Sequence, residues 1–364
     1  MTMLALGLMS GTSLDGVDAA LAVTDGVAVE RLGPAITVPY DADAREALRA
    51  VLGGVGDVAG IERALTLFHA DVVAKLLGDN GLSPGEVDVI GFHGHTILHR
   101  PHQRRTWQIG DGALLAGRTG IPVVCDFRTA DVRAGGQGAP LVPVFHRALA
   151  AGLPRPLAVL NLGGVGNVTW IGEDDRLLAF DTGPGNALID DWALRHTGRP
   201  VDVGGKLARM GRADTVAVET FARHPYFGRV PPKSLDRDDF RAFATGLVAE
   251  MGGADGAATL TAFTTRAAAL ARRHFPQPVR RWLVCGGGRH NPAIMAALKC
   301  ELEVPVDAVE AVGWDGDALE AQAFAYLAVR SLRDLPLTYP ETTGGPAPSL
   351  GGRFHRPGER RGEP

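Results

Sequence analysis

The sequence predicts an α/β protein built from two domains. Its 364 residues are more than one hydrophobic core usually organises. Strand-like and helical patterns alternate along the chain, and the opening arrangement of three strand-like runs begins again near residue 156. The 48 glycines cluster after strand-like runs, where they permit tight turns and let a ligand approach the backbone closely. We therefore expect one site assembled from several distant turns.

The N-terminal half predicts a sheet accompanied by helices. Short turns separate its first three strand-like runs, which indicates an antiparallel meander. Ile61, Leu65 and Phe68 recur at helical spacing in the second of two helices. The expected helices are 43–52 and 60–77, with a short one between the last two strands, and the expected strands are 3–9, 17–23, 27–38, 87–92, 106–110 and 122–127.

The C-terminal half predicts a second copy of this arrangement. Its expected strands are 156–162, 168–171, 177–180 and 282–285, and its expected helices are 186–196, three segments between 213 and 274, one from 291, and 317–332. We assign 1–140 plus 313–345 to an N-terminal domain and 141–312 to a C-terminal domain. The stretch 346–364 is rich in Pro, Gly and Arg with little to bury, so we expect it to be disordered.

The composition favours small molecules, and not nucleic acids or membranes, as binding partners. The formal net charge is -4 with mixed signs, and no run of Lys or Arg suits nucleic acid or an anionic membrane. The apolar start is too short to span a membrane and lacks the features of a signal peptide. Cys125, Cys285 and Cys300 form no C-x-x-C pair, and their odd number indicates a reducing compartment. We therefore expect a cytoplasmic protein.

Several common motifs of nucleotide binding and hydrolysis are missing from the sequence. Neither G-x-x-x-x-G-K-[ST] nor a strand-associated G-x-G-x-x-G with its downstream acid is present, which disfavours Walker-type and Rossmann nucleotide sites. H-E-x-x-H and G-x-S-x-G are also missing, which removes the simplest zinc-protease and α/β-hydrolase interpretations. What remains is a pair of similar strand-turn-strand loops.

The first of these loops links two strands through small residues, hydroxyls and carboxylates. Exposed N–H groups and hydroxyls can bind phosphate oxygens, and a carboxylate such as Asp15 can hold the accompanying Mg²⁺, although Asp18 is an alternative ligand. A polar β-turn without a ligand is an equally simple interpretation of this segment alone. The candidate nucleotide-binding residues here are Gly11, Thr12, Ser13, Leu14, Asp15, Gly16, Val17 and Asp18.

A second loop of the same kind makes the phosphate interpretation stronger. Gly163, Gly164 and Asn167 lie in a glycine-rich turn between two strands, where the fold begins again. A third turn, Gly286, Gly287 and Gly288, follows a buried strand and is placed to bind adenosine. Two repeated hairpins and such a turn are typical of the actin/hexokinase (ribonuclease H-like) arrangement, in which two domains flank a cleft for ATP and substrate.

The order of motifs also resembles a known family, the anhydro-N-acetylmuramic acid kinases, along almost the whole chain. This resemblance implies hydrolysis of the internal ether of 1,6-anhydro-N-acetylmuramic acid with transfer of the ATP γ-phosphoryl group to O6, in peptidoglycan recycling. It also implies a homodimer. The strings that carry it are MSGTSLDGVD, GFHGHTILHRP, TWQIGDG, DFRTADVRAGGQGAPLVP, NLGGVGNVT, DTGPGNALIDDW, CGGGRHN and DALEAQAFAYLA.

Such a reaction needs a base that activates water, and Asp181 is the candidate. It ends a strand and enters the tight turn before a helix, and the family's base lies in the same motif. The alternative is that Asp181 caps the following helix. As the 1,6 bond breaks, O6 becomes the phosphoryl acceptor, so catalysis would rest mainly on positioning and charge stabilisation.

Further residues are candidates for sugar binding. The histidines at 93, 95, 99 and 102 could instead hold zinc, but no Cys or acidic ligand lies close in sequence, so we prefer a sugar-binding loop. Arg128 and Asp131 are candidate contacts to the lactyl carboxylate and the hydroxyls of the sugar, respectively, with a surface ion pair as the alternative. For Glu320 the alternative is a solvent-facing helical position. The substrate candidates are His93, His95, Thr96, Arg128, Asp131, Gly183, Asn186 and Glu320.

Two departures from the family pattern leave specificity open. The family usually has Gln where His95 stands, and relatives commonly read PPKSTGRE where this chain has PPKSLDRD. One alternative function is therefore a kinase or phosphohydrolase of the same fold acting on another sugar. A second alternative, from a different class, is an ATP-dependent switch that modifies no small molecule.

Overall fold

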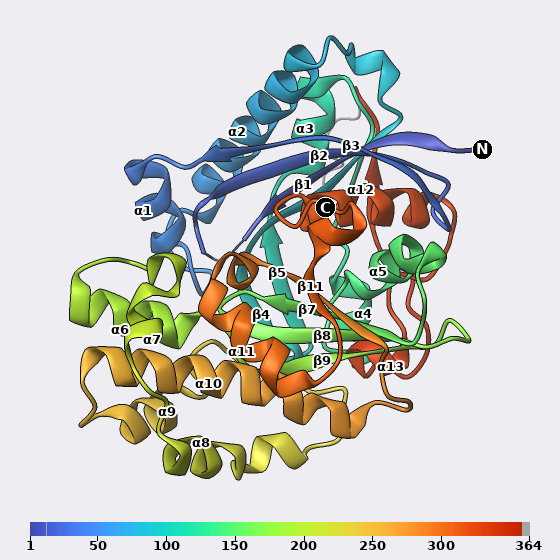
Figure 1. Cartoon of the computed structure of the whole chain (residues 1–364). Coiled ribbons are helices and arrows are strands. Elements are labelled where there is room, and N and C mark those ends of the chain that lie inside the picture. The colour runs from blue at the N-terminus through green and yellow to red at the C-terminus, as the bar shows by residue number, and fades with distance from the viewer. Residues whose placement is uncertain (12, 359–364) are drawn as a thin grey trace. The chain divides into compact units, whose positions relative to one another are not determined.

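The computed structural model describes residues 1–11 and 13–358, which fold into two compact α/β units (Figure 1). Unit 1 contains residues 1–151 and the described residues from 318 onward, and unit 2 contains residues 152–317. The chain therefore leaves unit 1 once and returns to it once. The two-domain α/β class predicted from the sequence is confirmed. The units divide at 151/152 and 317/318, whereas the boundaries expected from the sequence are 140/141 and 312/313.

Unit 1 is built on a seven-stranded mixed sheet in the order β12-β6-β4-β1-β2-β3, with β5 paired to β4. β1, β4 and β6 are parallel, whereas β1–β2, β2–β3, β4–β5 and β6–β12 are antiparallel pairs. The predicted meander is confirmed. The strands are β1 (Met3–Ser10), β2 (Gly16–Thr24), β3 (Val29–Pro39), β4 (Val89–Arg100), β5 (Arg105–Ile109), β6 (Val123–Cys125) and β12 (Arg353–His355).

Helices pack on both faces of this sheet. Leu6 and Leu8 of β1 belong to one apolar core with the buried residues of α2, while Gly7 between them faces α12. A Cβ on Gly7 would lie 1.7 Å from the Ala321 carbonyl oxygen, so only glycine lets α12 lie this close to the strand. The helices of unit 1 are α1 (Ala42–Ala50), α2 (Val58–Asp79), α3 (Gly112–Thr119), α4 (Thr129–Ala134), α5 (Pro143–Leu149), α12 (Leu319–Leu332) and α13 (Pro340–Thr343).

The prediction of a disordered tail is wrong for residues 346–358. β12 pairs with the edge strand β6, and Ser349 pairs with Thr338. The Ser331 hydroxyl also donates a hydrogen bond to the Gly351 carbonyl oxygen at 2.6 Å. Backbone pairing with a sheet edge orders this segment although it has few apolar side chains, and composition does not reveal such pairing. Residues 359–364 lie outside the described residues.

Unit 2 repeats the same topology on a five-stranded sheet in the order β11-β10-β7-β8-β9. β7, β8 and β9 form an antiparallel meander, β10 pairs in parallel with β7, and β11 pairs in parallel with β10. The strands are β7 (Leu157–Leu162), β8 (Val165–Ile171), β9 (Leu177–Pro184), β10 (Arg281–Cys285) and β11 (Val306–Ala308). The helices are α6 (Ala187–Thr197), α7 (Lys206–Met210), α8 (Thr215–Ala222), α9 (Arg241–Val248), α10 (Gly253–Ala271) and α11 (Pro292–Leu302).

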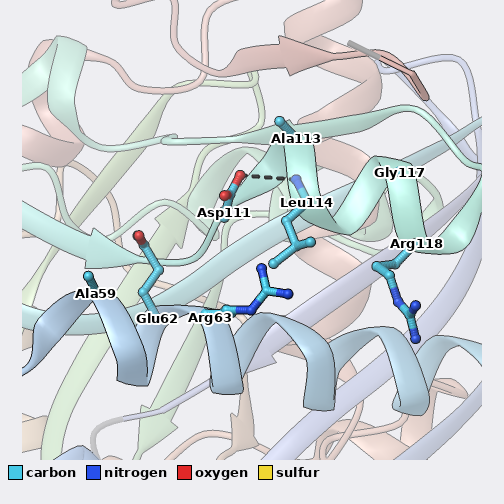
Figure 2. A pocket seen from close by; sticks show the side chains of 8 residues that line it. All are labelled: Ala59, Glu62, Arg63, Asp111, Ala113, Leu114, Gly117 and Arg118. Carbon is cyan, nitrogen blue, oxygen red and sulfur yellow. Dashed lines mark hydrogen bonds between the residues drawn. The ribbon is translucent and has the colours of Figure 1, made fainter. Parts of the chain in front are cut away.

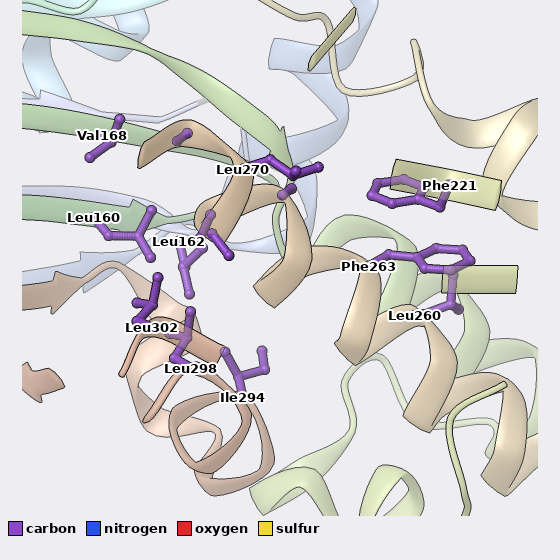
Figure 3. Packing of buried hydrophobic residues seen from close by; sticks show 14 of the residues in the cluster. Leu160, Leu162, Val168, Phe221, Leu260, Phe263, Leu270, Ile294, Leu298 and Leu302 are labelled. Atoms are coloured by element: carbon purple, nitrogen blue, oxygen red, sulfur yellow. The ribbon is translucent and has the colours of Figure 1, made fainter. Parts of the chain in front are cut away.

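The core of unit 2 packs one face of its sheet against helices that include α10 and α11 (Figure 3). Leu160, Leu162 and Val168 pack with apolar residues of α11, which include Ile294, Leu298 and Leu302. Phe221 and Phe263 stack in parallel, with ring centroids 4.3 Å apart. Full burial of each such side chain contributes about 1.5–3 kcal/mol, so this core holds the site-bearing ends of β7 to β10 in place. None of the helices in the described residues is both long and apolar enough to cross a membrane.

Candidate active site

The first hairpin turn, between β1 and β2, is anchored by a leucine in an unusual conformation. Leu14 has φ 60° and its side chain is 5% exposed within the core of unit 1. Its N–H donates to the Gly11 carbonyl oxygen at 3.1 Å. A left-handed backbone conformation is unfavourable for leucine, so burial of the Leu14 side chain must hold the turn in shape.

The residues of this turn that we predicted to bind nucleotide differ in exposure. Ser13 and Asp15 are exposed, Gly11 and Asp18 are partly exposed, and Leu14, Gly16 and Val17 are buried. Thr12 lies outside the described residues.

Tyr40 bonds to both ends of this turn. Its N–H donates to the Asp15 carbonyl oxygen at 3.1 Å, and its hydroxyl lies 2.7 Å from the Ser10 hydroxyl. Ser10 also lies 2.9 Å from Nδ1 of His95. Burial raises the pKa of Tyr40 to about 12, so the phenol keeps its proton at neutral pH. Our sequence reasoning missed both Ser10 and Tyr40.

His95 and His93 lie in a strand, so the prediction of a sugar-binding loop is wrong in this respect. β4 continues to Arg100 because β5 pairs with it through the histidine segment. His95 is 0% exposed and bonds to Ser10, and burial lowers its pKa to about 4, so the ring is neutral. Thr96 accepts a hydrogen bond from Gln108 of β5. A sugar contact by His95 stays a prediction that its burial does not favour.

His93 has a defined task, because it orients Arg128. Its Nδ1 lies 2.8 Å from the Gly94 carbonyl oxygen, and its Nε2 lies 3.2 Å and 3.0 Å from Nε and Nη2 of Arg128. The remaining guanidinium nitrogen donates to Gly138. Burial lowers the pKa of Arg128 to about 10, an effect that the negative charge of Glu320 opposes, so the guanidinium stays charged at neutral pH. Glu320 itself is exposed, in the first turn of α12.

Asp131 is tied into the structure of unit 1. Its Oδ1 accepts from the hydroxyls of Thr338 and Thr343 at 2.6 and 2.8 Å, and its Oδ2 accepts from the Gly138 N–H at 2.7 Å. The side chain is 2% exposed. These bonds hold α4 against residues 338–343, and the predicted contact to a sugar hydroxyl would have to displace one of them.

The second hairpin turn and the glycine turn at 286–288 lie together in unit 2. The N–H of Asn186 donates to the Gly163 carbonyl oxygen at 2.7 Å, and its side-chain amide donates to the Leu162 carbonyl oxygen at 2.9 Å. A Cβ on Gly288 would lie 2.6 Å from that of Leu162 and 2.9 Å from Oδ1 of Asn186. Asn186 therefore lies between the two glycine turns.

The glycines of the second turn offer hydrogen-bond donors to a ligand. Within the described residues, no hydrogen bond engages the N–H groups of Gly163 and Gly164. A Cβ at these positions would make only ordinary van der Waals contacts, at 3.8 and 3.7 Å. N–H groups without an internal acceptor, in an uncrowded turn, suit phosphate oxygens.

Three polar side chains form a row across the sheet of unit 2, near this turn. Asn161 of β7 pairs with Asn167 of β8, which pairs with Asp181 of β9. Paired positions on neighbouring strands point to the same face. The predicted base and the predicted ligand residue Asn167 therefore share one face with Asn161, which our sequence reasoning did not select.

Asp181 lies within β9 and is held by the segment 226–235. Its Oδ2 accepts from the Leu235 N–H at 2.8 Å, its N–H donates to the Lys233 carbonyl oxygen at 2.9 Å, and its carbonyl oxygen accepts from the Tyr226 hydroxyl at 2.5 Å. The helix-cap alternative is wrong, because Asn186 occupies the N-cap position of α6.

The surroundings of Asp181 suit a general base. Burial raises its pKa to about 7, the Leu235 hydrogen bond opposes that shift, and the negative charge of Asp236 adds to it. A carboxylate with a pKa near the working pH accepts a proton from water more readily than an ordinary aspartate. Within the described residues, no hydrogen bond engages the second oxygen, Oδ1.

Two other predicted or conspicuous residues have structural tasks. Gly183 is buried against α10, where a Cβ would lie 2.6 Å from that of Ala267, so it serves close packing. Arg289, directly after the glycine turn at 286–288, forms ion pairs with Glu310 and Asp317 at 2.7 and 2.9 Å and donates to the Gly286 carbonyl oxygen. These bonds fix the shape of the turn.

The acidic side chains near the first hairpin turn suit Mg²⁺ that arrives with a nucleotide better than a metal ion held by the protein alone. Within the described residues, no group of three or more His, Cys, Asp or Glu side chains is placed to hold one ion. Mg²⁺ that accompanies a nucleotide needs only one or two carboxylates besides phosphate oxygens and water. Asp15, exposed beside the first turn, can supply one such carboxylate.

A cavity of about 470 Å³ lies in unit 1, between the start of α2 and the length of α3 (Figure 2). Asp111 caps α3 there, with its Oδ1 3.0 Å from the Leu114 nitrogen. Its lining contains none of the predicted site residues and consists of Ala59, Glu62, Arg63, Asp111, Ala113, Leu114, Gly117 and Arg118.

Solved structures are similar to this chain at low sequence identity and modest TM-scores. An activator of 2-hydroxyisocaproyl-CoA dehydratase from Clostridium difficile has a TM-score of 0.47 and 14% identity, covering 91% of this chain and 96% of that one. A ROK family glucokinase from Streptomyces griseus has a TM-score of 0.40 and 14% identity, covering 89% and 99%. The repeated sheet order and the paired glycine hairpins place the chain in the actin/hexokinase class.

Sequence comparison identifies the family within that class. Residues 3–356 match the family model described as anhydro-N-acetylmuramic acid kinase. The anhydro-N-acetylmuramic acid kinase of Paramagnetospirillum magneticum is 68% identical over 98% of this chain and 100% of its own length. That of Rhodospirillum rubrum is 61% identical over 96% and 93%. The chain belongs to the anhydro-N-acetylmuramic acid kinase family.

Proposed function

We propose that the protein converts 1,6-anhydro-N-acetylmuramic acid, ATP and water into N-acetylmuramic acid 6-phosphate and ADP. Water adds to the anomeric carbon and loses a proton, the bond from that carbon to O6 breaks, and O6 takes the γ-phosphoryl group. The observation that supports this function most directly is the geometry of Asp181, a partly buried carboxylate with a pKa of about 7 and one oxygen free of hydrogen bonds. Family membership supplies the substrate.

We assign phosphate oxygens of ATP to the second hairpin turn, in unit 2, and the adenosine to the turn at 286–288. The free N–H groups of Gly163 and Gly164 support the first assignment. The first hairpin turn, in unit 1, is a separate candidate for phosphate binding. Asp15 is our choice for the carboxylate that accompanies Mg²⁺, which offsets the charge of the phosphates when it is bound. Asn186, which bonds to the second hairpin, would hold that hairpin in shape around a phosphate.

We assign the lactyl carboxylate of the sugar to Arg128. His93 and Gly138 fix three guanidinium nitrogens, and a fixed planar guanidinium suits carboxylate recognition. Glu320, whose charge acts on Arg128, is the second substrate candidate in this part of unit 1. A cytoplasmic location and a homodimer complete the proposal, and sedimentation measurements would test the oligomeric state.

Product analysis tests the proposed reaction. The protein is incubated with Mg-ATP and the anhydro sugar in ¹⁸O-water, and the products are examined by mass spectrometry. We expect a sugar 6-phosphate with ¹⁸O at the anomeric position, lost in Asp181→Asn. A folded, ATP-binding protein that makes no labelled product would contradict the proposal. Phosphorylation of a different sugar would then favour the related-kinase alternative, and ATP turnover that is equal with and without sugar would favour a switch.

A further inference from the structure

The segment from Tyr226 to Leu235 bonds to Asp181 on three sides. Asp181 belongs to β9, an edge strand of the sheet of unit 2, so its N–H has no strand partner on that side. The Lys233 carbonyl oxygen accepts from that N–H, the Leu235 N–H donates to Oδ2, and the Tyr226 hydroxyl donates to the Asp181 carbonyl oxygen. Only Oδ1 remains without a hydrogen bond in the described part of the chain.

The side chain of Lys233 holds this segment together. Its Nζ lies 3.1 Å from the Tyr226 carbonyl oxygen, 3.4 Å from the Phe227 carbonyl oxygen and 3.3 Å from Nε2 of His274. The ammonium also lies 4.6 Å from the ring centroid of Tyr226 and 5.5 Å from that of Phe180, within the range of cation–π attraction. Lys233 therefore joins both ends of the segment to the strand that carries Asp181.

Lys233 remains charged in this environment. Burial lowers its pKa to about 8, and the positive charge of Arg229 adds to that shift, so the ammonium is mostly protonated at neutral pH. A cation kept close to aromatic rings and carbonyl oxygens carries a desolvation cost, which its several contacts offset. Without these contacts, the Lys233 ammonium would be more stable in water than beside the rings.

We propose that Lys233 is a positioning residue that keeps the segment 226–235 against Asp181 and leaves Oδ1 as the one oxygen able to take a proton from water. The inference rests on the proposed function for its catalytic consequence, but the positioning itself is a property of unit 2. Lys233 does not need to touch the substrate to act in this way.

The main test compares Lys233→Met with Lys233→Arg, and uses Lys299→Met as the matched control because Lys299 is exposed on α11. Methionine keeps the length of the stem and removes the ammonium. We expect kcat of Lys233→Met to fall by about 10²-fold, the usual result of a misplaced catalytic group, with KM for ATP nearly unchanged. Arginine should restore most of the loss, since it can donate to both carbonyl oxygens and stack on the rings.

A second measurement, the pKa of Asp181, does not depend on enzymatic activity. ¹³C-labelled aspartate allows NMR titration of the carboxyl groups, and loss of a signal in Asp181→Asn assigns the resonance of Asp181. Because burial outweighs the Leu235 hydrogen bond in raising the pKa of Asp181, release of the segment should lower that pKa toward its ordinary value. The other titratable groups here are Tyr226, Asp236 and His274, which the variants leave in place.

The outcomes separate the two proposals. A wild-type protein without sugar kinase activity would remove the proposed function, and the NMR titration would still decide the role of Lys233. Unchanged kcat and an unchanged Asp181 pKa in folded Lys233→Met would overturn the inference. If Lys233→Met does not fold, Tyr226→Phe takes its place, because this variant removes the hydroxyl that bonds to Asp181 and keeps the ring. We then expect kcat to fall about fivefold, the equivalent of one hydrogen bond. No change in that variant would also overturn the inference.

Discussion

At the scale of single residues, burial sets the charge states of several side chains, in the site and elsewhere in the protein. The histidines at 69, 93, 95 and 146 are buried, and burial lowers the pKa of each, so all four rings are neutral at neutral pH. His93 uses its neutral Nε2 to accept from Arg128. Asp181 is the opposite case, because burial raises its pKa. Burial thus keeps the histidine rings uncharged, and it makes the Asp181 carboxylate a stronger base.

The raised pKa of Asp181 predicts a change of stability with pH. The pKa rises from 3.8 to about 7 on folding, so the folded state binds this proton more tightly than the unfolded state. Its contribution to stability is complete below the unfolded pKa and is lost as the pH rises to about 7. Asn cannot ionise and still accepts from the Leu235 N–H. We therefore expect Asp181→Asn to raise the free energy of unfolding at pH 8, by at most about 4 kcal/mol at 1.36 kcal/mol per pKa unit.

Urea unfolding at pH 4.5 and at pH 8 measures this difference. The gain in Asp181→Asn should be small at the lower pH and large at the higher one. Asp79→Asn is a suitable control, because Asp79 lies in an exposed ion pair with Lys75 on α2. A gain of equal size at both pH values would contradict the prediction and would show that the carboxylate is ordinary.

At the scale of elements, glycines decide how closely α12 approaches the sheet of unit 1. Gly7 of β1 and Gly91 of β4 both face α12, and a Cβ on Gly91 would lie 2.0 Å from the Phe324 carbonyl oxygen. α12 also carries Glu320 and the ring of Phe324, which lies 4.6 Å from that of His93. The close approach of this helix therefore helps to place the residues around Arg128.

Gly7→Ala should destabilise the protein strongly. Its new methyl group would collide with backbone atoms of α12, which cannot move without shifting the whole helix. Overpacking of this kind usually costs about 1–3 kcal/mol or more. Gly78→Ala is the matched control: it lies in α2 with nothing within 4 Å of a Cβ, and alanine should stabilise that helix by about 0.5–1 kcal/mol. Thermal unfolding of both variants measures the contrast, and equal melting temperatures would contradict it.

At the scale of the whole molecule, the chain divides unequally between its units. Unit 2 is one continuous segment with its own sheet and core, whereas unit 1 needs both ends of the chain. β12 and α12 pack in unit 1 with strands formed more than 200 residues earlier, at β6 and β1. Continuous segments with complete cores can fold alone.

We therefore expect residues 152–317, expressed alone, to fold. The isolated segment should unfold cooperatively on heating and give dispersed amide signals in NMR spectra. Residues 1–151 expressed alone should not, because they lack α12, which covers one face of their sheet. A disordered 152–317 segment would contradict the prediction and would show that its core depends on unit 1.

The sequence by itself determined the class of fold, both meanders and the glycine turns, because hydrophobic periodicity and turn chemistry are local signals. It also singled out Asp181, since a carboxylate between a strand and a tight turn is visible in one short motif. Resemblance supplied the family, which the comparisons confirm.

Only the tertiary structure decided the surroundings of these residues. Nothing in the sequence indicates that Lys233 and Leu235 bond to Asp181, or that Tyr40 bonds to both ends of the first turn, because each pair is joined by packing between distant segments. The histidine segment became a strand because β5 pairs with it, and residues 346–358 are ordered because β12 pairs with β6. Pairing and burial depend on partners far along the chain, and a local pattern carries no record of them.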